Sequence, residues 1–222
     1  MARRACALGM FGRAVLWTLL AGGCMGRGMT VRDPRVGDLS QIRGQAVQEI
    51  YLVPFSLSGV ELKGDHGDDK ERETNKAKWF THVVVGAQQA FNDKGPRTRV
   101  VCVKAGKSVY DREIFAKTEI SVDVREPAPP DALVVSGRYL FSENISGASR
   151  AFLGMMSGKS WTRAAISIAR GGREVYGCVL DGKYLGGGWS WGYETLGANE
   201  GLGRGIAEII RKLRKGEKIE TE

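Results

Sequence analysis

The sequence is poor in the residues on which most hydrolases and metalloenzymes depend. It has two histidines in 222 residues, His66 and His82, and it contains no HExxH or CxxC pattern. Such sites need a nucleophile or metal ligands at a fixed spacing. His82 has no second histidine or cysteine at ligand spacing, so we expect it to be a structural or partly exposed side chain. The sequence therefore predicts a non-enzymatic protein, with no catalytic residues, no metal site and no cofactor.

One acidic loop is a weak candidate for a cation site. The string GDHGDD places Asp65, His66, Asp68 and Asp69 close together. The spacing of a calcium loop and its terminal glutamate are both missing. A solvated acidic loop is the favoured interpretation, and a metal site is the alternative.

The chain also lacks a strong excess of one charge. Its formal net charge is +8, from 33 basic and 25 acidic side chains, but three of the basic residues and no acid lie in the first 23 positions. The remaining surplus is spread along the chain, whereas a nucleic-acid-binding domain gathers basic residues on one face. We expect no nucleic-acid partner.

The N-terminal apolar run, AVLWTLLA, is much shorter than the roughly 20 residues of a spanning helix. It follows a basic leader and precedes small residues, which is the layout of a secretory signal. LLAGGC resembles the lipobox of bacterial lipoproteins, in which the signal is removed before a cysteine that carries diacylglycerol. We therefore expect residues 1–23 to be a signal peptide and Cys24 to be lipidated. An ordinary cleaved signal and an uncleaved anchor are the alternatives.

The rest of the chain divides by composition. Residues 24–48 have Gly, Pro and scattered charge, which predicts a lipid-anchored tether. Residues 49–215 have the length of one domain, and residues 216–222 form a polar tail. Met25 stands where an aspartate would signal inner-membrane retention, so the lipoprotein resemblance implies an outer-membrane position facing the periplasm.

The clearest structural signal is a β-hairpin around Gly171 and Gly172, since both can adopt the positive φ of a type I′ turn. Pairing Arg170 with Arg173 sets the register. One apolar face then pairs Ala164, Ile166 and Ile168 with Val179, Gly177 and Val175. The other, mixed face pairs Ala165, Ser167 and Ala169 with Cys178, Tyr176 and Glu174.

Other segments predict a mixed α/β sheet of about five strands with two main helices packed on it. Strands are expected in EIYLVPFSLS, TRVVCVKA, around Ser121 to Arg125 and in ALVVSGRYLFSENIS. Pro54 argues for an edge strand or a bulge. The first helix runs from Thr74 to Asn92 with an apolar stripe at Ala77, Phe80, Val84, Ala87 and Phe91. The second is capped by Asn199 and buries Leu202, Ile206, Ile209 and Leu213.

Of the four cysteines, Cys102 and Cys178 fall on predicted strands. A disulfide would need these strands to be neighbours, because the two Cα atoms must lie within about 7 Å. Buried free thiols on separate strands are the favoured interpretation.

Two segments have the composition of a partner surface. GASRAFLGMMSGKS offers Phe152, Met155 and Met156 among glycines, and GGGWSWGY offers Trp189, Trp191 and Tyr193 at alternate positions. Aromatic and methionine side chains favour protein contacts. Self-association or docking on another envelope protein is one interpretation, and completion of the domain's own core is the other.

YLVPF, DALVVSGRYLF, SGASRAFLGMMSGKSW, IARGGREVYG and the closing helix resemble the uncharacterised bacterial lipoprotein family called domain of unknown function 4410. The resemblance covers roughly residues 49–215. It implies a cell-envelope lipoprotein of accessory or assembly type, held on the membrane through Cys24, with no catalytic residues to carry over. A soluble periplasmic protein that binds a ligand or partner is the alternative.

Overall fold

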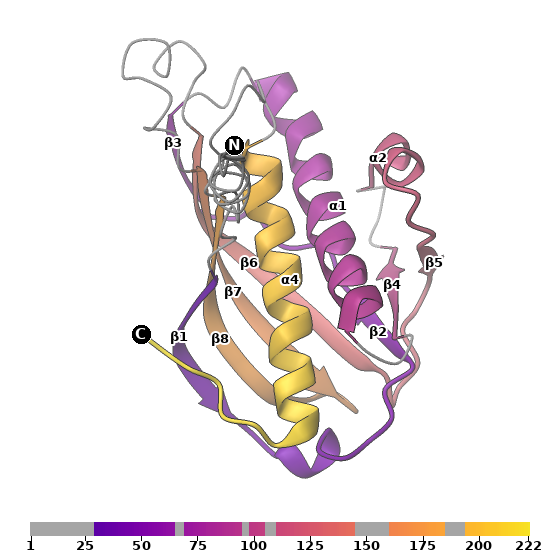
Figure 1. Ribbon diagram of the computed structural model, residues 1–222. Helices are drawn as coiled ribbons and strands as arrows, with labels where there is room; N and C mark the ends of the chain where they lie inside the picture. The colour runs from indigo at the N-terminus through magenta and orange to yellow at the C-terminus, as the bar shows by residue number, and fades with distance from the viewer. Residues whose placement is uncertain (1–28, 65–68, 95–97, 105–109, 145–159, 185–193) are drawn as a thin grey trace, which may run out of the picture.

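The computed structural model describes residues 29–64, 69–94, 98–104, 110–144, 160–184 and 194–222. These residues form one large mixed β-sheet with helices on one of its faces (Figure 1). The predicted α/β arrangement is therefore confirmed. The expected number of about five strands is too low, because the described residues contain eight strands, together with three α-helices.

The strands follow the order β1-β8-β7-β6-β2-β4-β5, and β3 pairs with β6 beyond the end of β2. The β1-β8-β7-β6 part is antiparallel, and β2, β3, β4 and β5 add to it in parallel. Their bounds are β1 Met29–Val36, β2 Glu49–Leu52, β3 Glu61–Gly64, β4 Arg99–Val103, β5 Asp123–Arg125, β6 Leu133–Asn144, β7 Ser160–Arg170 and β8 Arg173–Tyr184. Three α-helices, α1 Asp69–Lys94, α2 Arg112–Lys117 and α4 Glu194–Lys215, and a 3₁₀ turn, η1 Leu39–Gln41, complete the described elements.

The two strands missed from the sequence are β1 and β3. β3 lies in what reads as a polar loop, and Pro54 falls between β2 and β3, which both run along β6. β1 lies in the expected tether, residues 24–48, so the described part of that segment belongs to the domain rather than to a linker.

The expected polar tail, residues 216–222, also packs on the domain. The Glu222 backbone N–H donates to the Val31 carbonyl at 3.1 Å, and Ile219 packs against the core. In Figure 1 the C-terminal end runs beside β1. The tail therefore covers part of an edge strand, which is where a sheet would otherwise offer unpaired backbone groups.

The β7–β8 hairpin has the predicted turn but a different register. Gly171 and Gly172 have φ of +55° and +75°, and Arg170 lies opposite Arg173. Val175 is an extra residue, a β-bulge, so that Ile168 pairs with Tyr176 instead of Val175. Beyond the bulge the buried face of β8 consists of Tyr176, Cys178 and Leu180, and the prediction of Gly177 and Val179 on that face is wrong.

Helices α1 and α4 lie side by side on the sheet, with α4 over β7 and β8 (Figure 1). The predicted stripe of α4 is buried, but Asn199 is not its cap, because the helix begins at Glu194 and Asn199 is a buried residue inside it. Helix α1 is buried on all sides from Trp79 to Gln88, so its apolar stripe is wider than predicted. Gln88 is not one of the predicted stripe residues, yet it is buried and accepts a hydrogen bond from the Val100 backbone N–H at 2.7 Å.

Glycines set the distance between the two helices. A Cβ on Gly203 of α4 would lie 1.9 Å from the Val83 carbonyl oxygen of α1, and one on Gly86 of α1 would lie 2.2 Å from the Glu200 carbonyl oxygen. A Cβ on Gly182 of β8 would lie 2.2 Å from the Ala198 carbonyl oxygen. The backbones of α1 and α4 are therefore in direct contact at the first two glycines, and those of β8 and α4 at the third. None of these three positions has room for a side chain.

Cys102 and Cys178 are buried free thiols, as predicted. Cys102 is on β4 and Cys178 is on β8, and β2, β6 and β7 separate these strands. Burial raises the pKa of each thiol to about 12, so both stay protonated at neutral pH.

Candidate functional site: the helix-free face of the sheet

Most of the residues singled out from the sequence lie outside the described residues. These are Cys24, Asp65, His66, Asp68, Phe152, Met155, Met156, Trp189, Trp191 and Tyr193. Asp69 is the first residue of α1. The structure therefore gives no contacts for the predicted lipidation site or for the predicted partner surface.

The strand ends nevertheless show where the two candidate partner segments leave the sheet. β6 ends at Asn144 and β7 begins at Ser160, which pairs with Tyr184, the last residue of β8. β1 begins at Met29, which pairs with Gly182. Both segments therefore depart from the end of the sheet where β1 begins, which we call the Met29 end.

One face of the sheet is covered by none of the described helices, and we call it the helix-free face. It carries a row of aromatic and basic side chains near the Met29 end. The row, which we call the Trp161 row, consists of Lys63 on β3, Phe141 on β6 and Trp161 and Arg163 on β7. The Phe141 and Trp161 ring centroids are 4.8 Å apart, and the rings are inclined by 53°. The Arg163 guanidinium carbon lies 4.6 Å from the Trp161 centroid, and the Lys63 ammonium lies 5.4 Å from the Phe141 centroid. The Lys63–Phe141 cation–π contact links β3 to β6, and the pair of aromatic rings links β6 to β7.

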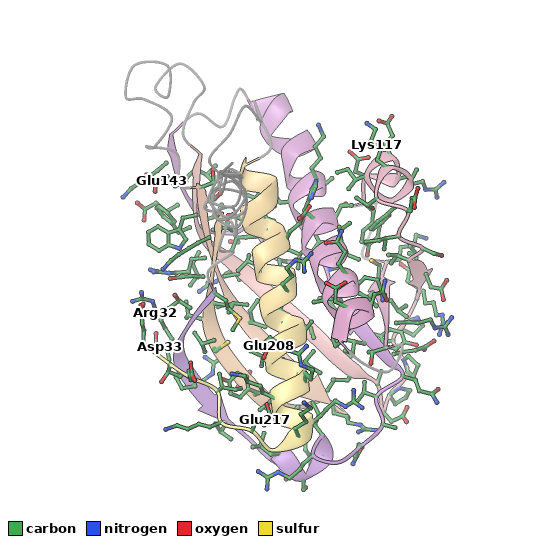
Figure 2. The ribbon with its side chains drawn as sticks, viewed as in Figure 1. Arg32, Asp33, Lys117, Glu143, Glu208 and Glu217 are labelled. Carbon is green, nitrogen blue, oxygen red and sulfur yellow. The ribbon has the colours of Figure 1, made fainter. Side chains whose placement is uncertain are left out.

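A buried carboxylate on β8 continues the row toward β1. Asp181 has no exposed side-chain surface and accepts two hydrogen bonds from Arg163, at 2.6 and 3.1 Å. Arg32 of β1 pairs with the same carboxylate at 3.3 Å. The hydrogen bonds that Arg163 donates to Asp181 raise the pKa of Arg163. Figure 2 shows Arg32 and Glu143 on the side of the sheet away from α4, at two places along this face.

The β7–β8 register predicted from the sequence does not bring Arg163 and Asp181 together. Pairing every residue from Arg170 and Arg173 without a bulge places Arg163 opposite Leu180, whereas the bulge at Val175 brings Arg163 opposite Asp181. The alternation of Trp161 and Arg163 along one strand was the available signal, since side chains two apart share a face. Their partners on β6 and β8 depend on a register that the sequence alone does not specify.

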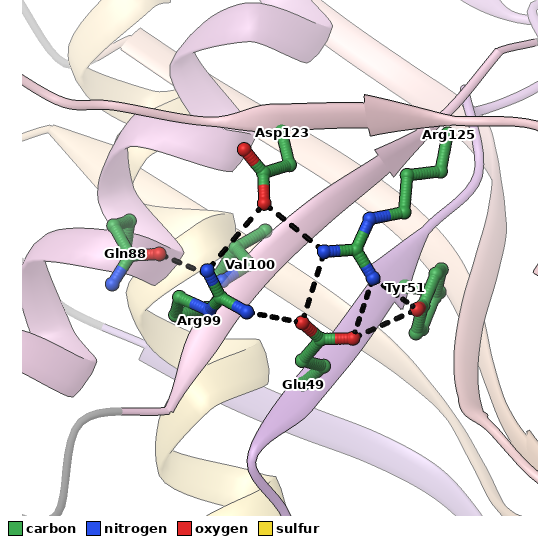
Figure 3. Close-up of polar contacts among 7 residues, drawn as sticks. All are labelled: Glu49, Tyr51, Gln88, Arg99, Val100, Asp123 and Arg125. Carbon is green, nitrogen blue, oxygen red and sulfur yellow. Dashed lines mark hydrogen bonds and ion pairs between the residues drawn. The ribbon is translucent and has the colours of Figure 1, made fainter.

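A second polar cluster lies on the same face at the other side of the sheet (Figure 3). Glu49 of β2 accepts hydrogen bonds from Arg99 at 2.6 Å, from Arg125 at 2.9 Å and from the Tyr51 hydroxyl at 2.8 Å. Asp123 pairs with both arginines, at 3.6 and 3.2 Å. We call these five residues the Glu49 network, and its contacts tie β2, β4 and β5 together.

The Glu49 network has the properties of a structural clamp. The Tyr51 hydroxyl, followed by Arg125 and Arg99, lowers the pKa of Glu49 from its ordinary 4.5, and burial raises the pKa of Tyr51. A carboxylate held ionised by two guanidinium groups is a poor base at neutral pH. Beside it lies a hollow of about 200 Å³, lined partly by Glu49, Tyr51 and Arg170. The Arg170 guanidinium is itself bonded to the carbonyls of Asp131 and Gln41.

His82 has the structural role expected of it. Its Nδ1 lies 3.0 Å from Glu200 Oε1, and it is buried where α1 and α4 cross. The described part of the chain holds no group of three or more His, Cys, Asp or Glu placed to bind a metal ion. Among the described helices, none combines the length and apolar character needed to cross a membrane.

No family model matches the chain, and no curated protein matches it. Among solved structures, the chain is similar to a PelC dodecamer from Paraburkholderia phytofirmans, with 11% identity and a TM-score of 0.36 over 86% of this chain and 100% of that one. A PelC dodecamer from the same organism with a Leu-to-Met substitution gives 10% identity and a TM-score of 0.37 over 84% and 98%. At these TM-scores the likeness carries no argument about function.

Proposed function

We propose that the protein is a lipid-anchored cell-envelope protein of accessory or assembly type, without enzymatic activity, that faces the periplasm from the outer membrane. The proposal is supported by the leader that ends at Cys24 and by the resemblance to the uncharacterised lipoprotein family. In the two clusters on the helix-free face, charged side chains pair with one another, as Arg163 does with Asp181 and Arg125 with Glu49. Such pairing is typical of a structural surface.

The observation that carries the proposal is the position of Cys24 relative to the fold. Cys24 follows the small residues of the leader and precedes the first strand residue, Met29, by five positions. Five residues span at most about 17 Å when fully extended. Acyl chains on Cys24 would therefore hold the domain next to the bilayer, with the Met29 end nearest to it.

The anchor is tested by metabolic labelling with a clickable fatty acid in the wild type and in Cys24→Ser. We expect label in the wild type and its loss in the variant, since the cysteine is the only site of diacylglycerol transfer in a lipobox. Equal labelling of the two proteins contradicts the proposal. A mature N-terminus that begins after another bond favours the soluble periplasmic alternative.

The second part of the proposal is a partner surface formed by Phe152, Met155, Met156, Trp189, Trp191 and Tyr193. Both segments leave the sheet at the Met29 end, so a partner bound there would sit close to the membrane surface. A photoreactive residue at Met155 or Trp191 in intact cells should give protein adducts, including adducts between copies of the chain. Adducts from a control site such as Lys117, with none from these two positions, would favour their role in the domain's own core.

A further inference from the structure

The Trp161 row lies at the end of the sheet that the proposed anchor reaches. Trp161 is the second residue of β7, and Lys63 is the penultimate residue of β3. Trp161 pairs with Lys183, which lies next to Gly182, the partner of Met29. The row therefore consists of residues near the strand ends, on the face that none of the described helices covers.

Distances place the row within reach of the same bilayer surface. β7 is two strands away from β1, and β6 is three, which corresponds to about 10 and 14 Å at the usual strand spacing of about 4.8 Å. The chain from Cys24 to Met29 spans at most about 17 Å. A lipid surface that holds Cys24 is thus close enough to meet Trp161 and Phe141 as well.

The chemistry of the row is that of a membrane interface. Tryptophan is enriched at the headgroup level, and long basic side chains reach from an apolar surface to the headgroups. The charges around the row are balanced, because Lys63 pairs with Glu61 and Arg163 pairs with Asp181. The aromatic rings, rather than a net positive charge, would therefore provide most of the contact.

We propose that the Trp161 row rests on the bilayer that carries the Cys24 lipid and fixes the orientation of the domain on it. This inference depends on the proposed function, since the lipid at Cys24 brings the row to the surface. The acyl chains already supply a durable anchor. The row therefore sets which face of the domain meets the headgroups, while retention on the membrane depends on Cys24.

The test uses the acylated full chain in vesicles of phosphatidylethanolamine and phosphatidylglycerol, with a photoreactive residue at Trp161. The control site is Val124, which is 48% exposed on β5, at the opposite edge of the sheet from β1. We expect a phospholipid adduct at Trp161 and none at Val124. The adduct should persist at high salt, which screens attraction between exposed charges and anionic lipid but leaves aromatic contact intact.

A second measurement avoids the photoreactive residue. Brominated phospholipid should quench part of the tryptophan fluorescence of the wild type, and Trp161→Phe should lose that part while it stays on the vesicles. The variant should fold, because the indole N–H of Trp161 has no hydrogen-bond partner among the described residues. Unchanged quenching in Trp161→Phe overturns the inference.

The remaining outcomes separate the two proposals. If the Cys24 peptide is acylated but Trp161 and Val124 give equal lipid adducts, the inference is wrong and the anchor is retained. The same holds if the peptide is acylated and Trp161 gives no lipid adduct. A protein adduct at Trp161 in intact cells, in place of lipid, assigns the row to a protein partner and also overturns it. A Cys24 peptide without acyl chains removes the proposed function and the inference together.

Discussion

The crossing of α1 and α4 offers a matched pair of substitutions in one helix. An alanine Cβ at Gly203 would lie 1.9 Å from the Val83 carbonyl oxygen and 2.7 Å from the Ala87 nitrogen. Both atoms belong to the backbone of α1, so neither can turn aside as a flexible side chain would. At Gly201 the nearest atoms, Gly182 Cα and the Lys183 backbone, are 3.5 to 3.6 Å away, which is ordinary van der Waals contact.

The two changes should therefore have opposite signs. Overpacking lowers the free energy of unfolding by about 1–3 kcal/mol. Replacing glycine by alanine inside a helix raises it by about 1 kcal/mol through helix propensity. Because the obstacle at Gly203 is backbone, we expect the upper end of that cost and a net loss of about 2 kcal/mol for Gly203→Ala. Gly201→Ala meets no obstacle, so it should gain about 0.5–1 kcal/mol.

Urea unfolding followed by far-UV circular dichroism measures both changes. The midpoint should fall for Gly203→Ala and rise for Gly201→Ala, with an unchanged m-value that shows the same surface being exposed on unfolding. Equal midpoints for the two variants, or a Gly203→Ala variant at least as stable as the wild type, would refute the close helix crossing.

Three further predictions concern the sheet. Ile166→Asp should lower the stability by more than about 3 kcal/mol, because it buries an unpaired carboxylate, whereas Ala165→Asp on the helix-free face should melt near the wild type; equal melting temperatures would contradict the facing of β7. The lowered pKa of Glu49 means that its contribution is complete above its unfolded value of 4.5 and is lost as the pH falls through the folded value. Thermal melts of Glu49→Gln should therefore differ from the wild type at pH 7 and approach it at strongly acid pH, and a constant difference at all pH values would argue against the network. The Cys102 and Cys178 thiols should resist a thiol reagent in the native protein and react after denaturation, since both are buried and have raised pKa values; fast reaction before unfolding would show that these strands open.

Local patterns predicted most of the sheet correctly. Runs of β-branched and aromatic residues located β2, β4, β6, β7 and β8, and short alternation located β5. β1 was missed because MTVRDPRV carries Pro34 and three basic or acidic residues in its middle. Its pairing depends on β8 and on the C-terminal tail, which are more than 130 residues away, and no local pattern reports such a contact.

The predicted N-terminal boundary of α4 is wrong for a different reason. GANEGLGRG contains glycines that disfavour a helix by propensity, so the sequence predicts a helix start at Asn199, whereas the helix begins at Glu194. The structure shows what the glycines at positions 203 and 205 leave room for: the Val83 carbonyl of α1 in the first case, and Met29 and Leu180 in the second. A glycine needed for close packing and a glycine that ends a helix are indistinguishable in a single sequence.

The two ends of the sheet differ in a way that bears on function. At the far end β7 and β8 meet through the two-residue turn at Gly171 and Gly172, and α4 ends in a left-handed Gly216 with the Glu217 N–H bonded to the Lys212 carbonyl. At the Met29 end the chain between β6 and β7 and the chain between β8 and α4 are long. Binding residues concentrate on loops that a rigid scaffold holds in place. The residues that we propose as a partner surface belong to these two long connections, at the end of the sheet where β1 begins.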